Sequence, residues 1–305
     1  MVTFNSLKEI SISEKTAVAI GFFDGIHKGH QKVINTALEY KKKGCKVCVF
    51  SFSISQNGYN KERTNLKILS IQDKTDFLES MGVDYFVNPD FSEIKELSPY
   101  EYVRDILYKK LNTQVVCCGF DFHYGKMASG NTKTLEHDCT DFGITVNVVD
   151  SVNIEGLVAS STVIRKAILH GDMDTAANIL GRSYYYTLPV IQGKKLGRTL
   201  GFPTINQCFT SEQAEPPSGV YASTAKIDGT NYHAVTSIGK NPTVGGKNTV
   251  SETYIMGMNR DLYGKNVTIS LCKFLRPQYK FESIEKLSEQ ISEDVESSKK
   301  FFHDI

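Results

Sequence analysis

The sequence predicts an α/β domain with a parallel sheet, followed by an all-β domain. Three observations support this class. Short apolar runs alternate with helical patterns over the first ~180 residues, which is typical of βαβ units. After Arg182 the chain becomes rich in β-branched and aromatic residues separated by turn residues. The 305 residues are also enough for two domains of about 150 residues each. We therefore expect domains at 1–182 and 183–305.

The elements of the first domain follow from its apolar periodicity. Strands are expected at 16–21, 46–52, 83–87, 115–118 and 144–149. Helices are expected at 30–43, 73–81, 98–111 and 161–170. Gly44 is typical of a helix C-cap, and Ser98, Pro99 and Glu101 form a capping-box pattern. Ligands of such sheets bind beyond the carboxyl ends of the strands.

The second half predicts a closed or nearly closed antiparallel sheet. Its strand-like segments lie at 184–193, 219–227, 232–239, 249–258 and 266–275. Asp228-Gly229 is a hairpin turn signal between two of them. An amphipathic segment at 283–302 predicts a C-terminal helix.

Composition excludes some classes of function. The net charge of +1 gives no basic field for nucleic acid or an anionic membrane. The sequence contains no run of about 18 apolar residues, so we expect no membrane span. The N-terminal sequence MVTFNSLKEI lacks signal-peptide features. Seven scattered cysteines show no metal-site spacing beyond Cys45 and Cys48, so we expect reduced thiols and a cytoplasmic location.

The segment GFFDGIHKGH, residues 21–30, ends a strand and begins a helix. Backbone amides at a helix start bind phosphate groups, helped by the helix dipole. His27 and His30 are three residues apart and share one face, and Gly29 between them lets a ligand come close. Two imidazoles there can stabilise charge on a departing pyrophosphate. For an isolated HxGH, a capped helix with two surface histidines is an equally good interpretation.

The longer string resembles GxFDGxHxGH, the signature of the FMN adenylyltransferase module of bacterial bifunctional riboflavin kinase/FAD synthetases. CGFDFHYG (118–125) and VASSTVIRKAILHGD (158–172) are similar to two further motifs of that family. The resemblance implies a Rossmann-like nucleotidylyltransferase domain. It assigns catalysis to His27, His30 and Arg165. It assigns phosphate binding to Gly21, Phe22, Asp24, Gly25, Gly29, Asp121, Ser161 and Thr162.

One stretch departs from the family pattern. Where the family carries TFxPHP, this chain reads FSFSISQNGYN, so that Ile54, Ser55 and Gln56 replace the Pro-His-Pro. This removes an imidazole near the expected phosphates and two prolines that restrict the loop. His123 also stands where the family more often has Arg.

The segment QGKKLGRTLGFPTINQ, residues 192–207, combines glycines, cations and a hydroxyl–amide pair. Thr204 and Asn206 alternate, so both point to one side of an extended segment. Their oxygens suit Mg²⁺ bridging the phosphates of ATP. For PTxN alone, a turn with two satisfied polar groups is the better interpretation.

This longer string resembles GRxLGFPTxN, the riboflavin kinase signature, and PPSGVYA, SIGKNPTV, SETYI and DLYGK follow in family order. The resemblance implies a riboflavin-kinase β-barrel with a terminal helix. It makes Glu252 the general base for the ribityl 5′-hydroxyl and Thr204 and Asn206 the metal ligands. It assigns nucleotide binding to Gly193, Lys195, Gly197, Arg198 and Tyr263. Tyr254 replaces a common family histidine.

Together these resemblances imply a bifunctional enzyme that uses ATP and Mg²⁺ to convert riboflavin to FMN and FMN to FAD. The expected partners are small molecules, with no nucleic acid or membrane, in a monomer or weak homo-oligomer. Two alternatives stay open at this point. One is an enzyme with a single active half, the other a non-catalytic flavin-binding regulator.

Overall fold

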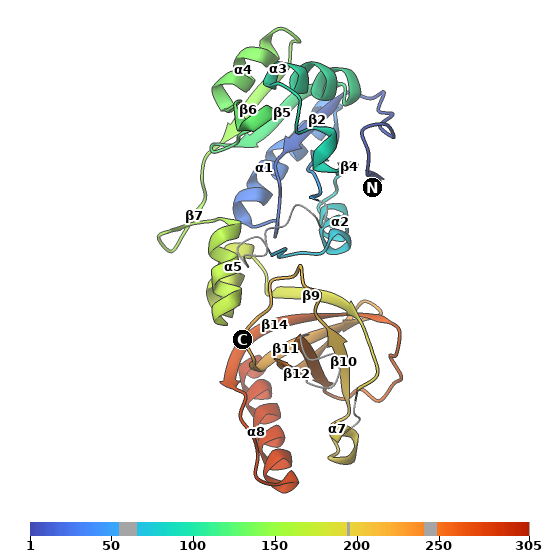
Figure 1. Ribbon diagram of the computed structural model, residues 1–305, viewed down its shortest axis with the longest axis vertical. Helices are drawn as coiled ribbons and strands as arrows, with labels where there is room; N and C mark the ends of the chain where they lie inside the picture. Colours follow the sequence, from blue (N-terminus) through green and yellow to red (C-terminus); the bar gives the residue numbers. More distant parts are fainter. Residues whose placement is uncertain (55–65, 194–195, 241–248, 305) are drawn as a thin grey trace. The chain divides into compact units, whose positions relative to one another are not determined.

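The structure is a computed structural model that describes residues 1–54, 66–193, 196–240 and 249–304. Its contacts divide the chain into two compact units, drawn in Figure 1. The first unit comprises Met1–Asn65 and Lys74–Ser160, and the second comprises Leu66–Asp73 and Ser161–Ile305. This division follows packing and not activity, so the functional boundary after residue 182 stays a prediction.

The first unit contains the predicted parallel sheet, in the order β1-β4-β3-β2-β5-β6. All its strand pairs are parallel. The strands are β1 Val2–Phe4, β2 Thr16–Ile20, β3 Lys46–Phe50, β4 Tyr85–Val87, β5 Thr113–Gly119 and β6 Thr145–Val149. The edge strand β1 was not predicted, because three residues give too short a pattern.

The helices of this unit are α1 Lys28–Leu38, α2 Ile71–Ser80, whose first three residues belong to the second unit, α3 Pro99–Glu101 and α4 Thr132–Thr140, with a π-helix over Tyr102–Lys110. Helix α3 begins where the capping signal at Ser98 indicated, and α1 and α2 each begin two residues before the predicted start. Gly44 is the left-handed C-cap of a 3-10 turn that extends α1. Ser98 and Glu101 form the predicted capping box. Helix α4 was not predicted, since its sequence is mostly polar.

The strand order reverses between β2 and β5, which are neighbours in the sheet. From β2 the chain proceeds to β3 and β4 in one direction, and β5 and β6 lie in the other. In open α/β sheets, ligands bind outside the carboxyl ends of the strands at this switch point. The segments that follow β2 and β5 start at Gly21 and Phe120. The topology therefore brings two loops to one edge of the sheet. One follows β2 and carries His27 and His30 (the histidine loop), and the other follows β5 and carries Asp121.

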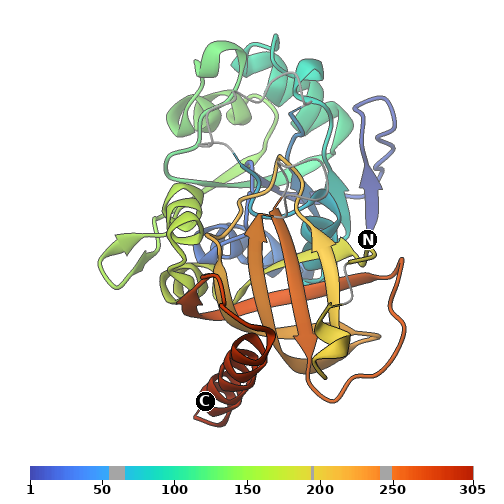
Figure 2. The ribbon, with the colours of Figure 1, turned by 60° about the horizontal axis from the view of Figure 1, so that its bottom comes forward.

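The second unit is built on an antiparallel sheet in the order β10-β13-β12-β11-β14-β9. The strands are β9 Tyr184–Pro189, β10 Thr204–Cys208, β11 Gly219–Ile227, β12 Thr230–Lys240, β13 Thr249–Ile255 and β14 Asn266–Pro277. A bridge between Ile191 and Asn206 joins the two edges. The buried Gln207 amide also donates to the carbonyls of Leu188 and Val267. The sheet thus closes into the expected barrel, whose curvature Figure 2 shows.

Helix α8, Ile284–His303, packs on the outer face of this barrel with Ser283 as its N-cap. Ser298 Oγ donates to the carbonyl of Ala234, and Val295 packs with Val220 and Val235. Helices α5 Ser161–His170, α6 Met173–Leu180 and the short α7 Leu196–Thr199 complete the second unit. A small hairpin of β7 Asn153–Ile154 and β8 Leu157–Val158 belongs to the first unit.

All seven cysteines are free thiols. Five of them are buried, and these all lie in the first unit: Cys45, Cys48, Cys117, Cys118 and Cys139. Cys208 and Cys272 in the barrel are partly exposed. Burial raises the pKa of Cys117, Cys118 and Cys139 to about 12.

Candidate active sites

The first site is the loop between β2 and α1. His27 is the N-cap of α1, and its Nδ1 accepts a hydrogen bond from the backbone N–H of His30 at 3.3 Å. The two imidazoles stack with ring centroids 3.6 Å apart. Gly29 permits this, because a Cβ there would come within 3.0 Å of the His27 ring. The structure therefore brings the two predicted histidines together at a helix N-terminus.

The His30 ring is held in a desolvated setting. Phe23 contacts it edge-on at 5.2 Å between centroids, and His30 Nδ1 is buried with no hydrogen-bond partner among the described residues. Burial lowers the pKa of His30 well below its ordinary value, and the charges of His27 and Lys74 lower it further. His30 is therefore neutral near pH 7 before any ligand binds.

The backbone of this loop is strained. Phe23 and Ile26 have φ of 51° and 40°, a region that residues other than glycine seldom occupy. Gly25 between them has φ of 80°, which glycine adopts without strain. Asp24 in the same loop is only 3% exposed. Strained backbone in a site that is over-determined by its surroundings is a frequent feature of catalytic loops.

A cavity of about 470 Å³ opens beside Gly21, at the same sheet edge. Its walls are mainly apolar, with several aromatic rings among them: Phe52, Phe91, Tyr102, Phe122 and Tyr124. His123 lines it as well, and its Nδ1 lies 2.8 Å from the carbonyl of Asp121. Asp121 itself is exposed. A flat aromatic ligand matches such walls in size and polarity.

The other predicted phosphate ligands lie on α5 of the second unit. The helix begins at Ser161 itself, one residue earlier than a cap at Ser161 would place it, and Thr162 is exposed. Arg165 Nε donates to the carbonyl of Leu66 at 2.7 Å. The two positions that replace the family's second proline and its histidine, Ser55 and Gln56, lie outside the described residues.

The second site is on the outer face of the barrel, where three strands run side by side. In the antiparallel register, Glu252 on β13 stands opposite Asn206 on β10 and Ser237 on β12. Thr204 stands opposite Tyr254, two positions along. Paired residues of antiparallel strands point to the same face. The register therefore brings the predicted base and both predicted metal ligands to one surface.

Gly193 leaves the space that Asn206 occupies. A Cβ at this position would come within 2.4 Å of the side-chain nitrogen of Asn206 and within 2.6 Å of its oxygen. The backbone N–H of Ile191 donates to the carbonyl of Asn206 at 2.8 Å, which fixes the two segments together. A hydroxyl and an amide oxygen on one face are ligands of the type that Mg²⁺ accepts beside water and phosphate.

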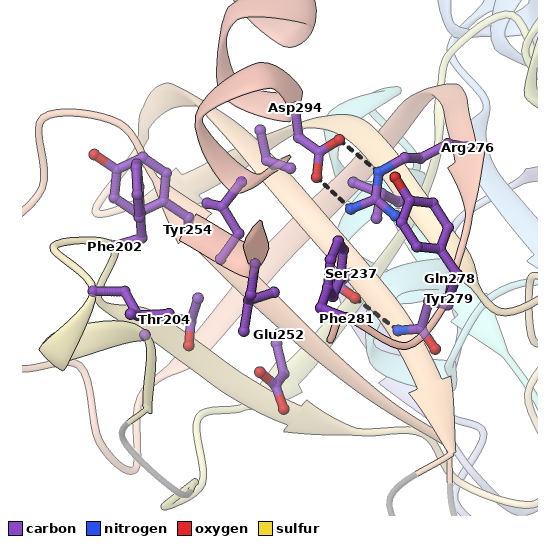
Figure 3. A pocket seen from close by; sticks show the side chains of 16 residues that line it. Phe202, Thr204, Ser237, Glu252, Tyr254, Arg276, Gln278, Tyr279, Phe281 and Asp294 are labelled. Carbon is purple, nitrogen blue, oxygen red and sulfur yellow. Dashed lines mark hydrogen bonds and ion pairs between the residues drawn. The ribbon is translucent and has the colours of Figure 1, made fainter. Parts of the chain in front are cut away.

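A cavity of about 360 Å³ lies between this face and α8. Figure 3 shows Glu252 and Thr204 on one side of it and an Arg276–Asp294 ion pair on the other. Arg276 donates to both carboxylate oxygens of Asp294 at 2.7 and 2.6 Å, and it stacks on Tyr279. The cavity thus has apolar walls with a carboxylate at one end.

The remaining predicted nucleotide residues lie around this face. Gly197 lines the cavity, and a Cβ there would come within 2.4 Å of the carbonyl of Phe202. Arg198 on α7 is exposed. Tyr263 is 41% exposed and is not among the residues that line the cavity. Lys195 lies outside the described residues.

Sequence reasoning missed several residues of these sites. Arg276 and Gln278 line the cavity under α8, and no pattern in the sequence around them indicated this. Lys74 is buried at 7% exposure beside the histidine loop, where it donates to the carbonyl of Phe22 at 2.9 Å. A lysine in an amphipathic helix is normally a surface residue, so no sequence signal indicated this position.

Two family models match this chain, one in each half. The family model described as FAD synthetase matches residues 9–163, and the one described as riboflavin kinase matches 180–302. The bifunctional riboflavin kinase/FMN adenylyltransferase of Bacillus subtilis is 34% identical over 95% of this chain and 94% of its own length. The protein of the same name from Listeria monocytogenes is 34% identical over 93% and 92%.

A solved structure covers nearly the whole fold. It is titled a macrolide-efflux protein from Streptococcus pneumoniae, is 30% identical, covers 98% of both chains and superposes with a TM-score of 0.87. Within the described ranges of this chain, none of the helices has the length and apolar character needed to span a membrane.

Proposed function

The chain belongs to the family of bifunctional riboflavin kinase/FMN adenylyltransferases, and from that premise we propose which residues carry each of its two reactions. It transfers the γ-phosphate of ATP to riboflavin, giving FMN and ADP. It also transfers AMP from ATP to FMN, giving FAD and pyrophosphate. None of the comparisons favours a one-activity enzyme or a non-catalytic flavin-binding regulator.

For the kinase reaction, Glu252 is the general base. Its carboxylate takes the proton of the ribityl 5′-hydroxyl as that oxygen attacks the γ-phosphorus of ATP, and ADP leaves. Support comes from the cavity, which Glu252 lines and which is large enough for a flavin ring. Gly193 and Gly197 allow the backbone to approach the phosphates of ATP. Lys195, Arg198 and Tyr263 keep their predicted roles in nucleotide binding.

Thr204 and Asn206 are the residues that would hold Mg²⁺ in this site. Both are neutral oxygen donors, they share a face with Glu252, and Gly193 leaves room beside Asn206. When bound, Mg²⁺ neutralises phosphate charge during the transfer. The protein residues then position the hydroxyl and hold the proton at the Glu252 carboxylate.

For the adenylyl transfer, His27 and His30 contact the β- and γ-phosphates of ATP. A phosphate oxygen of FMN attacks the α-phosphorus, and the bond to the pyrophosphate oxygen breaks. Hydrogen bonds from the imidazoles and from the amides at the start of α1 stabilise the charge that develops on pyrophosphate. Support comes from the stacked pair at the helix N-terminus. Arg165, Ser161, Thr162 and Asp121 keep their predicted phosphate roles.

The two cavities are the proposed flavin sites. The aromatic cavity beside Gly21 takes the ring system of FMN, and the cavity under α8 takes that of riboflavin. The cavity beside Gly21 lies in the same unit as His27 and His30, and the cavity under α8 lies in the same unit as Glu252, Thr204 and Asn206. The observation that supports the assignment of residues is that a cavity of suitable size lies beside Gly21, in the loop that carries His27 and His30, and that another is lined by Glu252.

The test separates the two reactions in one protein. Purified protein is given riboflavin, ATP and Mg²⁺, or FMN, ATP and Mg²⁺, and the flavins are separated by chromatography. Glu252→Ala is expected to abolish FMN formation and to keep FAD formation, whereas His30→Ala is expected to do the reverse. If either substitution removes both activities from a folded protein, the assignment of residues is wrong.

We also propose that the protein works in the cytoplasm as a monomer or weak homo-oligomer. Its substrates are small molecules, with ATP as co-substrate, and its seven thiols are all unpaired.

A further inference from the structure

A buried lysine contacts the loop that carries the two histidines. Lys74 belongs to α2, and its Nζ lies at the carboxyl ends of β2 and β3. It donates to the carbonyl of Phe22 at 2.9 Å and lies 3.5 Å from Ser51 Oγ. Ser51 Oγ donates to the same carbonyl at 2.8 Å. Two donors therefore hold one carbonyl group of the loop.

The direction of that carbonyl controls the strained residue that follows. The carbonyl of Phe22 and the N–H of Phe23 belong to one planar peptide group. Holding the carbonyl therefore restricts the φ angle of Phe23, which is 51°. The Phe23 ring in turn contacts the His30 ring edge-on. A mechanical connection runs from the Lys74 ammonium through this peptide group and Phe23 to His30.

The ammonium group also acts on His30 through its charge. Burial has the largest effect on the pKa of His30, and electrostatic interactions with His27 and with the Lys74 ammonium act in the same direction. Lys74 is 7% exposed, so solvent screens its charge only weakly. Both effects, the mechanical and the electrostatic, act on the same imidazole.

We propose that Lys74 is a positioning residue for FMN adenylylation. It fixes the Phe22–Phe23 peptide and thereby the His30 ring, and its charge adds to the burial that disfavours protonation of that imidazole. This inference rests on the proposed role of the histidine loop. It adds a residue outside the recognised motif, on a helix that has no other part in the chemistry described above.

Three substitutions at this position separate the two effects. Lys74→Arg keeps both the charge and a donor, Lys74→Gln keeps a donor without the charge, and Lys74→Met keeps neither. Ser51→Ala is the matched control, because it removes a hydrogen bond to the same carbonyl without changing any charge. Riboflavin phosphorylation by the same protein molecules reports that the chain is folded.

We expect Lys74→Met to lower kcat for FMN adenylylation by about 100-fold, the loss that a displaced reacting group can produce. Lys74→Arg should retain activity within about 3-fold of wild type, and Ser51→Ala within about 10-fold, since one neutral hydrogen bond is lost. In all four variants riboflavin phosphorylation should be unchanged. If Lys74→Met does not fold, the other two variants test the proposal. Lys74→Gln should then lower kcat for FMN adenylylation more than Lys74→Arg does.

The pH profile supplies a measurement that a purely structural role would not move. Because Lys74 lowers the pKa of His30, loss of its charge raises that pKa. The inflection of kcat/KM that belongs to His30 should therefore move to higher pH in Lys74→Gln and Lys74→Met, and stay in place in Ser51→Ala.

Full adenylylation activity in Lys74→Met, or an unshifted inflection in both uncharged variants, overturns the proposal. Equal losses in Lys74→Arg and Lys74→Gln also overturn it, because the lysine would then act only through its shape. A wild-type protein that forms no FAD from FMN would instead refute the proposed function of the loop, and is detected before any variant is made.

Discussion

Replacing Gly193 by alanine should strongly slow riboflavin phosphorylation, although Glu252 is unchanged. The added Cβ would lie 2.4 to 2.6 Å from the three amide atoms of Asn206, whereas an ordinary contact begins at 3.4 Å. The amide must therefore retreat by about 1 Å. A displacement of that size at a reacting group can cost about 100-fold in rate. We expect a loss of that order in kcat for FMN formation.

The assay measures FMN formed from riboflavin and ATP, with FMN adenylylation by the same sample as the control for folding. A double-substitution cycle makes the test specific. Asn206→Ala should give a comparable loss, and adding Gly193→Ala to it should cost little more, because the crowded amide is already gone. Wild-type FMN formation in Gly193→Ala, or losses that multiply in the double variant, would refute the reasoning.

Three further predictions follow from the contacts described. Asp294→Ala removes the carboxylate that pairs with the partly buried Arg276, which should cost about 2 to 3 kcal/mol and lower the urea midpoint for loss of riboflavin phosphorylation, but not that for adenylylation. Ser98→Ala removes the capping box and should lower the free energy of unfolding of the first unit by about 1 kcal/mol, measured by circular dichroism; an unchanged transition would contradict it. Excess EDTA should abolish riboflavin phosphorylation, and Mg²⁺ should restore it, whereas activity that survives the chelator would argue against a metal at Thr204 and Asn206.

Much of the fold was predictable from local signals. Strands β2 and β3 in the middle of the parallel sheet are apolar on both faces, as buried parallel strands must be, and each stands out as a continuous run. Ser98 and Gly44 marked helix ends because capping depends on local backbone geometry. Short or polar elements gave no such signal, and β1, α4 and α6 were therefore missed.

The sites were predictable only where a motif is contiguous in sequence. The histidines of GFFDGIHKGH are three residues apart and stack in the structure. The pairing of Glu252 with Asn206 depends on strand register, which spacing along the chain does not contain. Lys74 lies 44 positions from His30 in sequence. Its burial depends on how α2 packs against the loop, which composition and periodicity do not determine.

The buried cysteines of the first unit can be used to measure its unfolding. Its five thiols lie in or against the sheet core, whereas the barrel thiols are partly open to solvent. A thiol-reactive dye attacks the thiolate, which burial suppresses, so the first-unit thiols should react only through openings that expose them. Their labelling rates therefore measure the opening free energy of the adenylyltransferase half while the kinase half stays folded. A ligand that binds beside Gly21 would reveal itself by slowing those rates, without any catalytic turnover.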